Sequence, residues 1–328
     1  MTLSGSGNLP VDAAHGDLCF TTLVFGGYQR YVPYYVYSAL RSYPSSWVRV
    51  FVEAPVDEGC LAALQAIRQQ LSGRFDLVEH EPAAPPAVDV PLLRVDPRTF
   101  SRFLVPPDLL AGFRYVYAGD VDMFFLPESP SLLDFHLEHM KRTGLPISNC
   151  VRFSRDGTPT ERLTGLHFFK TEEYFSALGP LIEKLGTTPS SLRDFLAGLS
   201  WDEEALYRLV GSEFDISGLV STDCERPWHG LHLGAARKHR PTSITTERFR
   251  ENSSLPQEVC ASIVQEWLSD PLLDTILRLC PDRSFFNYFL FLNLRAGSMA
   301  TRFAVQQHSV VGWLKEIKRR IQAVGSLA

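Results

Sequence analysis

The sequence predicts an α/β protein with a mostly parallel, doubly wound sheet, flanking helices and a helical C-terminal extension. The first observation is that short apolar runs alternate with segments of helical periodicity. Strands that alternate with helices pair in parallel, and right-handed crossovers place the helices on both faces of the sheet. The second observation is that the pattern is helical from about residue 255 onward. Together they define the expected architecture.

The elements of the first half follow from the apolar runs and from the residues that end them. The predicted elements are strands at 19–26, 48–53, 75–80 and 113–119 and helices at 31–43 and 61–72. Residues 81–97 are rich in Pro and Ala and predict a loop. The short helix predicted at 100–110 is broken by Pro106 and Pro107.

The second half mixes both kinds of element. It predicts helices at 131–144 and 192–211, a strand at 162–170 and a loop at 226–238. We therefore expect three regions along the chain: a flexible N-terminus at 1–17, a main domain at 18–250 and a helical C-terminal region at 251–328.

Composition and charge exclude several classes of protein. The formal net charge of -5 gives no general attraction to nucleic acid. The N-terminal 17 residues lack the basic and apolar regions of a signal peptide, and no apolar run reaches the roughly 18 residues of a membrane span. We expect a cytoplasmic protein whose six cysteines are buried thiols: Cys19, Cys60, Cys150, Cys224, Cys260 and Cys280.

Two aspartates follow the apolar strand predicted at 113–119. Asp120 and Asp122 are separated by one residue and are followed by Met123, Phe124 and Phe125. Ligands of open α/β sheets bind at the carboxyl ends of parallel strands, and Mg²⁺ or Mn²⁺ uses one or two carboxylates together with substrate phosphates. Burying a charged side chain costs free energy unless the charge is paired or binds a metal. We therefore predict that these aspartates hold a divalent metal.

The loop at 226–238 is a second candidate region. It contains His229 and His232, two glycines, and the cations Arg237 and Lys238. An imidazole can bind Mn²⁺, and a cation close by can neutralise a departing diphosphate. We predict that His232 is the third metal ligand, with His229 as the alternative.

Around the Asp-x-Asp pair the sequence FSRFLVPPDLLAGFRYVYAGDVDMFFL resembles the signature of glycosyltransferase family 8, the relatives of glycogenin and of bacterial lipopolysaccharide galactosyltransferases, which have the GT-A fold. The resemblance implies that Arg102 binds the donor and that Asp120 and Asp122 bind the metal. In the family, an Asn-small-Gly segment contacts the donor sugar. Residues 163–165 resemble it at Thr164 and Gly165, with a leucine in the asparagine position.

Two further segments extend the resemblance over roughly residues 19–238. The family's Asp-Gln-Asp helix start is similar to residues 202–204, where Asp202 and Glu203 take its first two positions. Its His-x-x-Gly-x-x-Lys motif is similar to the segment from His232 to Lys238, with the glycine one place early, at Gly234. The resemblance implies catalytic roles for Arg102, Asp202 and Glu203 and a donor-binding role for Lys238. Because Glu203 replaces a glutamine, a general base for an inverting reaction stays an alternative.

Aromatic and glycine residues follow the first predicted strand. In enzymes of this kind the end of that strand holds the nucleotide, so we predict that Phe25, Gly26 and Tyr28 bind the base and ribose. The segment lacks the GxGxxG and GxxxxGK[ST] motifs, which excludes a dinucleotide fold and a P-loop as predictions.

The expected function is transfer of a sugar from a UDP-sugar to an acceptor hydroxyl on a glycan, lipid-linked glycan or protein. It requires Mn²⁺ or Mg²⁺ and, if the family mechanism holds, retains the anomeric configuration. A nucleotidyltransferase that makes a nucleotide-sugar is one alternative, and a non-catalytic carbohydrate-binding module is another. The first would need a glycine-rich basic loop after the first strand, which FGGYQRYVP resembles poorly.

Two helical segments complete the predictions. His136 and His139 lie three residues apart in a charged helix, without the spacing of a zinc motif, and are expected on a solvated face. Residues 310–325 form an amphipathic basic pattern, which is compatible with peripheral contact with the inner face of a membrane or with packing on the domain. A glycolipid acceptor would suit the first possibility.

Overall fold

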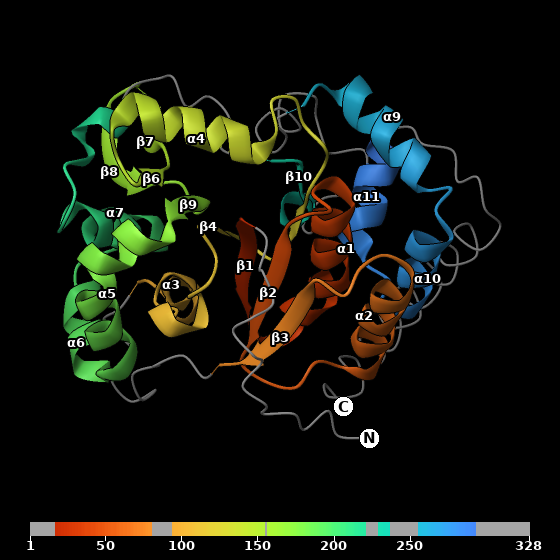
Figure 1. Cartoon of the computed structure of the whole chain (residues 1–328), viewed down its shortest axis with the longest axis horizontal. Helices are drawn as coiled ribbons and strands as arrows, with labels where there is room; N and C mark the ends of the chain where they lie inside the picture. Colours follow the sequence, from red (N-terminus) through yellow and green to blue (C-terminus); the bar gives the residue numbers. More distant parts are fainter. Residues whose placement is uncertain (1–16, 81–93, 155, 221–228, 237–254, 293–328) are drawn as a thin grey trace, which may run out of the picture.

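A six-stranded sheet occupies the middle of the molecule, with helices on both sides (Figure 1). The computed structural model describes residues 17–80, 94–154, 156–220, 229–236 and 255–292. The strand order is β3-β2-β1-β4-β9-β6. The strands are β1 (Leu18–Val24), β2 (Trp47–Val52), β3 (Phe75–Glu79), β4 (Tyr115–Ala118), β6 (Ile147–Ser148) and β9 (His167–Lys170).

Most of this sheet is parallel. β1 pairs in parallel with β2 and with β4, and β2 pairs in parallel with β3. β9 is antiparallel to both β4 and β6. The predicted α/β fold with a mostly parallel sheet and flanking helices is therefore confirmed. Because β1 and β4 are adjacent and parallel, their carboxyl ends lie next to each other at one edge of the sheet.

One face of the sheet is covered by helices from both ends of the described chain (Figure 1). These helices are η1 (Gly26–Tyr31), α1 (Val32–Ser42), α2 (Glu58–Gln70), α9 (Gln257–Trp267), α10 (Pro271–Leu279) and α11 (Arg283–Phe291). Tyr34 stacks on Phe285 with ring centroids 5.3 Å apart, and its hydroxyl donates to the Cys280 carbonyl at 2.6 Å. These contacts join the helical C-terminal region to α1.

The other face carries α3 (Pro97–Phe100), the short helices η3 (Ser101–Phe103) and η4 (Pro107–Leu109), α5 (Thr171–Thr187), α6 (Pro189–Leu196) and α7 (Asp202–Gly211). They form a second apolar core around residues such as Phe103, Leu178 and Leu206. The helix is broken at the two prolines, as expected: Pro106 precedes η4 and Pro107 begins it. α5 was not predicted, because Gly179 and Pro180 interrupt its apolar pattern; the pattern resumes at Ile182.

Two short antiparallel ladders lie outside the main sheet. β5 (Met123–Phe124) pairs with β10 (Leu231–His232), which η6 (Leu233–Ala236) follows, and β7 (Val151–Phe153) pairs with β8 (Pro159–Leu163). The strand predicted at 162–170 is thus two strands, β8 and β9. Between them the turn at Thr164 is fixed by Asn149, whose Oδ1 accepts from the Thr164 amide at 3.0 Å.

The predicted solvated face of α4 (Leu132–Thr143) is wrong for its two histidines. His136 and His139 are 5% and 1% exposed, and the Nδ1 atom of each lies within 2.8 Å of the Ser148 hydroxyl on β6. His136 also stacks on Phe168 of β9 at 4.5 Å. Polar neighbours at the sheet edge satisfy the two imidazoles, so spacing in the sequence alone did not reveal which side of α4 faces the protein.

Four of the five cysteines in the described residues follow the prediction. Cys19, Cys60, Cys260 and Cys280 are buried free thiols. Cys150 is disulfide-bonded, so the prediction of a thiol there is wrong, and Cys224 lies outside the described residues. Within the described ranges, no helix has both the length and the apolar character needed to cross a membrane. The segment at 310–325 lies outside these ranges, as do residues 1–16 and 81–93.

Two buried histidines predict how stability depends on pH. Burial lowers the pKa of His167 to about 3 and holds the pKa of His136 well below its ordinary value. The unfolded histidines take up protons near pH 6.5 and the folded ones do not, so stability is full above that pH and falls below it. Between pH 7.5 and pH 5, the proton uptake of unfolded His167 should lower the free energy of unfolding by about 2 kcal/mol, and His136 should lower it further.

Urea unfolding at both pH values measures this loss. His167→Gln removes one titrating group, so its loss of unfolding free energy over the same interval should be smaller than that of the wild type by about 2 kcal/mol. An equal loss in both proteins would show that His167 is protonated in the folded state.

Candidate functional site

A cavity of about 220 Å³ opens at the carboxyl ends of β1 and β4. It is lined by Thr22, Leu23, Phe25, Tyr28, Arg98, Thr99, Arg102, Gly119, Asp120, Val121, Asp122 and His232. Strand ends that meet at one edge of a parallel sheet form the usual ligand crevice of α/β proteins. The cavity therefore lies where the sequence placed the Asp-x-Asp pair.

The two aspartates are held by the buried segments on either side of them. All four residues of β4 and both residues of β5 are buried, so the turn between the two strands has little freedom. The Met123 amide donates to the Asp120 carbonyl at 3.2 Å and closes this turn. Asp122 is only 3% exposed, whereas the side chain of Asp120 is 31% exposed. Both carboxylates line the cavity.

The β5–β10 ladder carries a histidine to the aspartates. His232 pairs with Met123 in the ladder, and the Leu233 amide donates to the Asp122 carbonyl at 2.7 Å. His232 Nε2 lies 3.1 Å from Asp122 Oδ1 and 4.0 Å from Asp120 Oδ2. One ligand atom from each of the three residues therefore lies within 4.8 Å of the other two.

The geometry distinguishes the two candidate histidines. His229 is 1% exposed, and its Nδ1 lies 3.0 Å from a carboxylate oxygen of Glu128. Its Nε2 lies 3.0 Å from Nε2 of His136. Both ring nitrogens of His229 are thus engaged in a buried hydrogen-bonded chain, and His232 is the histidine that faces the cavity.

The electrostatics of the cluster favour a cation. Burial raises the pKa of Asp120 above its ordinary value; the Arg102 guanidinium opposes this effect and the Asp122 carboxylate adds to it. Two carboxylates and one imidazole are a suitable donor set for Mn²⁺ or Mg²⁺, which accept oxygen ligands and keep positions for phosphate and water. The residues present therefore fit a divalent metal.

Arg102 lies beside this cluster and connects it to α7. Its Nη2 atom is 2.8 Å from Asp202 Oδ2 and 3.5 Å from Asp120 Oδ1. Its Nη1 atom donates to the Thr99 carbonyl at 2.7 Å, which fixes the plane of the guanidinium. A Cβ atom at Gly165 would lie 2.8 Å from Nη2, so a glycine there leaves room for the arginine. The structure thus brings together four residues to which the family resemblance assigns roles: Arg102, Asp120, Gly165 and Asp202.

Other predicted residues lie elsewhere. Thr164 is buried, and its hydroxyl lies 2.7 Å from Asn149 Oδ1. Glu203 contacts Arg152 at 2.6 Å and Arg162 at 3.1 Å, so both of its carboxylate oxygens are engaged. Gly26 is in the left-handed region with φ of +54°. None of these three lines the cavity as formed by the described residues, and Lys238 lies outside those residues.

The end of the cavity formed after β1 is aromatic. Phe25 and Tyr28 have ring centroids 5.9 Å apart, and Arg98 lies 5.0 Å above the Phe25 ring. Arg98 is held by Asp96 at 2.9 Å. Arg98 is not among the residues predicted from the sequence. Its spacing of four residues from Arg102 would have pointed to the same side of a helix.

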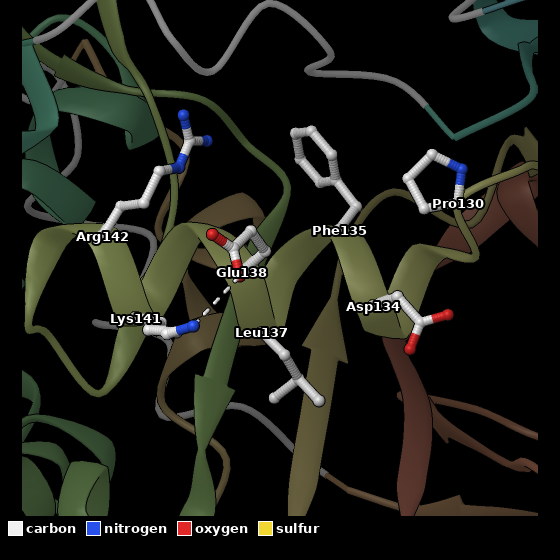
Figure 2. Close-up of a pocket in the computed structure, with 7 residues that line it drawn as sticks. All are labelled: Pro130, Asp134, Phe135, Leu137, Glu138, Lys141 and Arg142. Atoms are coloured by element: carbon white, nitrogen blue, oxygen red, sulfur yellow. Dashed lines mark ion pairs between the residues drawn. The ribbon is translucent and has the colours of Figure 1, made fainter.

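A larger hollow of about 490 Å³ lies along α4 (Figure 2). Its side chains come from Pro130 and one helix, and they fan outward without converging on a centre (Figure 2). Lys141 and Glu138 form an ion pair there at 3.9 Å between two exposed side chains. The smaller cavity at the strand ends has the convergent charged groups that binding and catalysis require.

No known family model and no curated protein matches the sequence. Among solved structures, the chain is similar to the galactosyltransferase LgtC in complex with donor and acceptor sugar analogs, with 14% identity, a TM-score of 0.34, and coverage of 55% of this chain and 71% of that one. It is similar to core-mannan synthase A of Aspergillus fumigatus in its Mn/GDP form, with 10% identity, a TM-score of 0.38, and coverage of 61% and 71%.

A third similarity is to residues 1–349 of S. aureus TarS, with 10% identity, a TM-score of 0.32, and coverage of 90% and 92%. Similarity at this level does not identify a family. The function is therefore argued from the chemistry of the site itself.

The ladder that positions His232 yields a prediction. Gly230 has φ of +118°, and a Cβ atom there would lie 2.2 Å from the Phe124 carbonyl oxygen. Gly230→Ala should therefore force β10 away from β5 and lower the free energy of unfolding by about 3 kcal/mol or more in urea titrations.

Gly144→Ala is the matched control, because Gly144 has φ of +70° but no atom within 4 Å of the added Cβ. It should cost only about 1 kcal/mol, from backbone strain alone. Equal costs for the two variants would contradict a close approach at Gly230.

Proposed function

We propose that the protein is a metal-dependent glycosyltransferase that moves a sugar from a UDP-sugar donor to a hydroxyl of a carbohydrate or glycolipid acceptor. The observation that carries the proposal is the cluster of Asp120, Asp122 and His232 at the carboxyl ends of parallel strands. The cavity joins this cluster to an aromatic end at Phe25 and Tyr28. A nucleoside diphosphate has matching parts, since its base is flat and its diphosphate binds divalent metals.

Asp120, Asp122 and His232 would hold Mn²⁺ or Mg²⁺. When bound, such a cation neutralises the diphosphate and stabilises the charge that develops on the leaving group. The two carboxylates are fixed by buried strands before any ligand arrives, which limits the reorganisation needed to bind. The partial exposure of Asp120 is consistent with access from the cavity.

The residues of the chain itself would position the donor. The rings of Phe25 and Tyr28 would stack against the uracil base, with the ribose near Gly26. Arg98, whose side chain is 45% exposed, has donors for the ribose or a phosphate. Lys238 would neutralise the departing UDP.

Around the anomeric carbon, Asp202 is the carboxylate that we propose to act in catalysis. Arg102 contacts it at 2.8 Å and fixes its position beside the cavity. A carboxylate at this place would stabilise the positive charge that develops on the sugar ring, which is compatible with retention of configuration. In the turn between β8 and β9, Gly165 would leave room for the donor sugar beside Arg102, and Thr164, bonded to Asn149, would hold this turn in place.

Glu203 differs from the other residues expected in catalysis. Arg152 and Arg162 engage both of its oxygens, so its carboxylate is directed at the two arginines and we do not assign it the role of general base. We propose that it positions α7 so that Asp202 faces Arg102.

The extent of the catalytic domain (18–250), the helical region (251–328) and the membrane contact through 310–325 stay predictions.

A panel of UDP-sugars tests the proposal. With Mn²⁺ and no acceptor, the wild type should slowly hydrolyse at least one of them, measured as release of UDP. Asp122→Asn should reduce this rate by roughly a hundredfold, because one metal ligand loses its charge. Asp194→Asn is the control, because the Asp194 side chain is 75% exposed on α6. This variant should hydrolyse the donor at the wild-type rate. An Asp122→Asn variant as active as the wild type would contradict the metal assignment.

Gly165→Ala tests the arrangement around Arg102. The added methyl would lie 2.8 Å from Arg102 Nη2, so the guanidinium must move away from Asp120 or Asp202. We expect donor hydrolysis to fall roughly tenfold, because misplacing a charged group by about 1 Å costs catalysis far more than stability. Gly218→Ala, which adds a methyl in open space, should change neither rate nor stability. An unchanged rate in Gly165→Ala would show that the position of Arg102 is not important for turnover.

A further inference from the structure

A large aromatic side chain is exposed at the start of α7. Trp201 is 53% exposed, the highest value among the large hydrophobic side chains in the described residues. Single exposed apolar residues are common and need no special explanation. Trp201 differs in two respects: Arg162 packs against its ring, and the next residue is Asp202.

One face of the Trp201 indole is covered by a fixed cation. The guanidinium carbon of Arg162 lies 4.8 Å from the ring centroid. Arg162 Nε donates to Glu203 at 3.1 Å, and Arg152 binds the second oxygen of the same carboxylate at 2.6 Å. The side chain of Glu203 is only 12% exposed, so it holds both arginines in place. The arginine thus supports one side of the ring, in the stacked geometry that guanidinium groups favour.

The backbone of Trp201 is fixed as well. Its carbonyl accepts from the amides of Glu204 and Ala205 at 3.1 and 3.2 Å, as at a helix N-terminus. The Glu204 carboxylate in turn accepts from the amides of Ser200 and Trp201 at 2.6 and 3.3 Å. This reciprocal capping fixes the chain at the point from which the indole projects. The ring is therefore a rigid surface with an accessible side.

The indole belongs to the residue that precedes the proposed catalytic carboxylate. Asp202 follows Trp201 directly and is 2.8 Å from Arg102, which is 3.5 Å from Asp120. A ligand that lies against the indole would therefore lie at the same end of α7 as the carboxylate proposed to face the anomeric carbon. The aromatic pair proposed for the donor base, Phe25 and Tyr28, lines the cavity, and Trp201 does not.

We infer that Trp201 forms an acceptor subsite, in which a pyranose ring of the acceptor stacks its apolar C–H face on the indole. This inference rests on the proposed function. A pyranose has a flat face of C–H groups and a rim of hydroxyls, which match an aromatic surface bordered by guanidinium donors. Arg152, whose side chain is 36% exposed and is bound to Glu203, donates to those hydroxyls. Arg162 and Glu203 position the indole and do not contact the sugar.

The test uses methyl β-glycosides of glucose, galactose, N-acetylglucosamine and mannose with the full-length protein, UDP and Mn²⁺. Saturation-transfer difference NMR should detect binding of at least one glycoside, with the strongest signals from the ring protons of one face. Trp201→Ala should weaken this binding by roughly tenfold or more, and Trp201→Phe by a much smaller factor, because a ring is retained. Leu279→Ala removes a side chain of similar exposure (41%) on α10 and should bind like the wild type.

Where a UDP-sugar is hydrolysed, the same variants are compared in transfer to that glycoside. The KM for the glycoside should rise in Trp201→Ala by the same factor as the loss of binding, and Trp201→Phe should restore most of it. If no glycoside binds, or if Trp201→Ala binds as well as the wild type, the inference is wrong, even where the wild type hydrolyses the donor. If Trp201-dependent binding is found but no UDP-sugar is hydrolysed, the subsite stands and the proposed donor chemistry fails.

Discussion

The pairing of β5 with β10 is the constraint on which the candidate site depends. It joins Asp122 to His232, which are 110 residues apart in the sequence, through a ladder of two residues on each strand. So short a ladder has little stability of its own. It persists because Leu231, Leu233 and both residues of β5 are buried, and their backbone groups would lose hydrogen bonds in the core if the strands separated. The imidazole is therefore placed by the packing of the core, independently of any metal.

From this ladder to α7, carboxylates lie next to arginines across the site. The aspartate pair is followed by Arg102, then by Asp202, and on the next residue of α7 by Glu203 with its two arginines. Each half-buried charge after the first pair has an opposite neighbour, which offsets much of the cost of burial. At the aspartate pair, Arg102 is shared between Asp120 and Asp202. A divalent cation held by Asp120, Asp122 and His232 would add positive charge at this end, where the three ligand atoms converge.

How much of this the sequence could predict depends on the range of the interactions involved. Apolar runs identified β1 to β4 and α1 because their burial follows from local pattern, and the position of Asp120 after a buried strand identified the cavity. The sequence could not settle the prediction of His232 against the alternative His229, since the outcome depends on the register of a long-range ladder. The burial of His136 was missed for the same reason: its partners, Ser148 and His229, come from other elements.

The site also lies where the two apolar cores meet. Met123, Phe124 and Leu233, around Asp122 and His232, belong to the core with α1 and the C-terminal helices. Phe103 and Leu206, beside Arg102 and Asp202, belong to the core with α5 to α7. Arg102 is closer to Asp202, which lies beside the same core, than to Asp120, which lies beside the other core. The two distances are 2.8 Å and 3.5 Å. A small relative shift of the cores would therefore change the Arg102–Asp120 distance first. A ligand that contacts both Asp120 and Arg102 would therefore sense the relative position of the two cores through this distance.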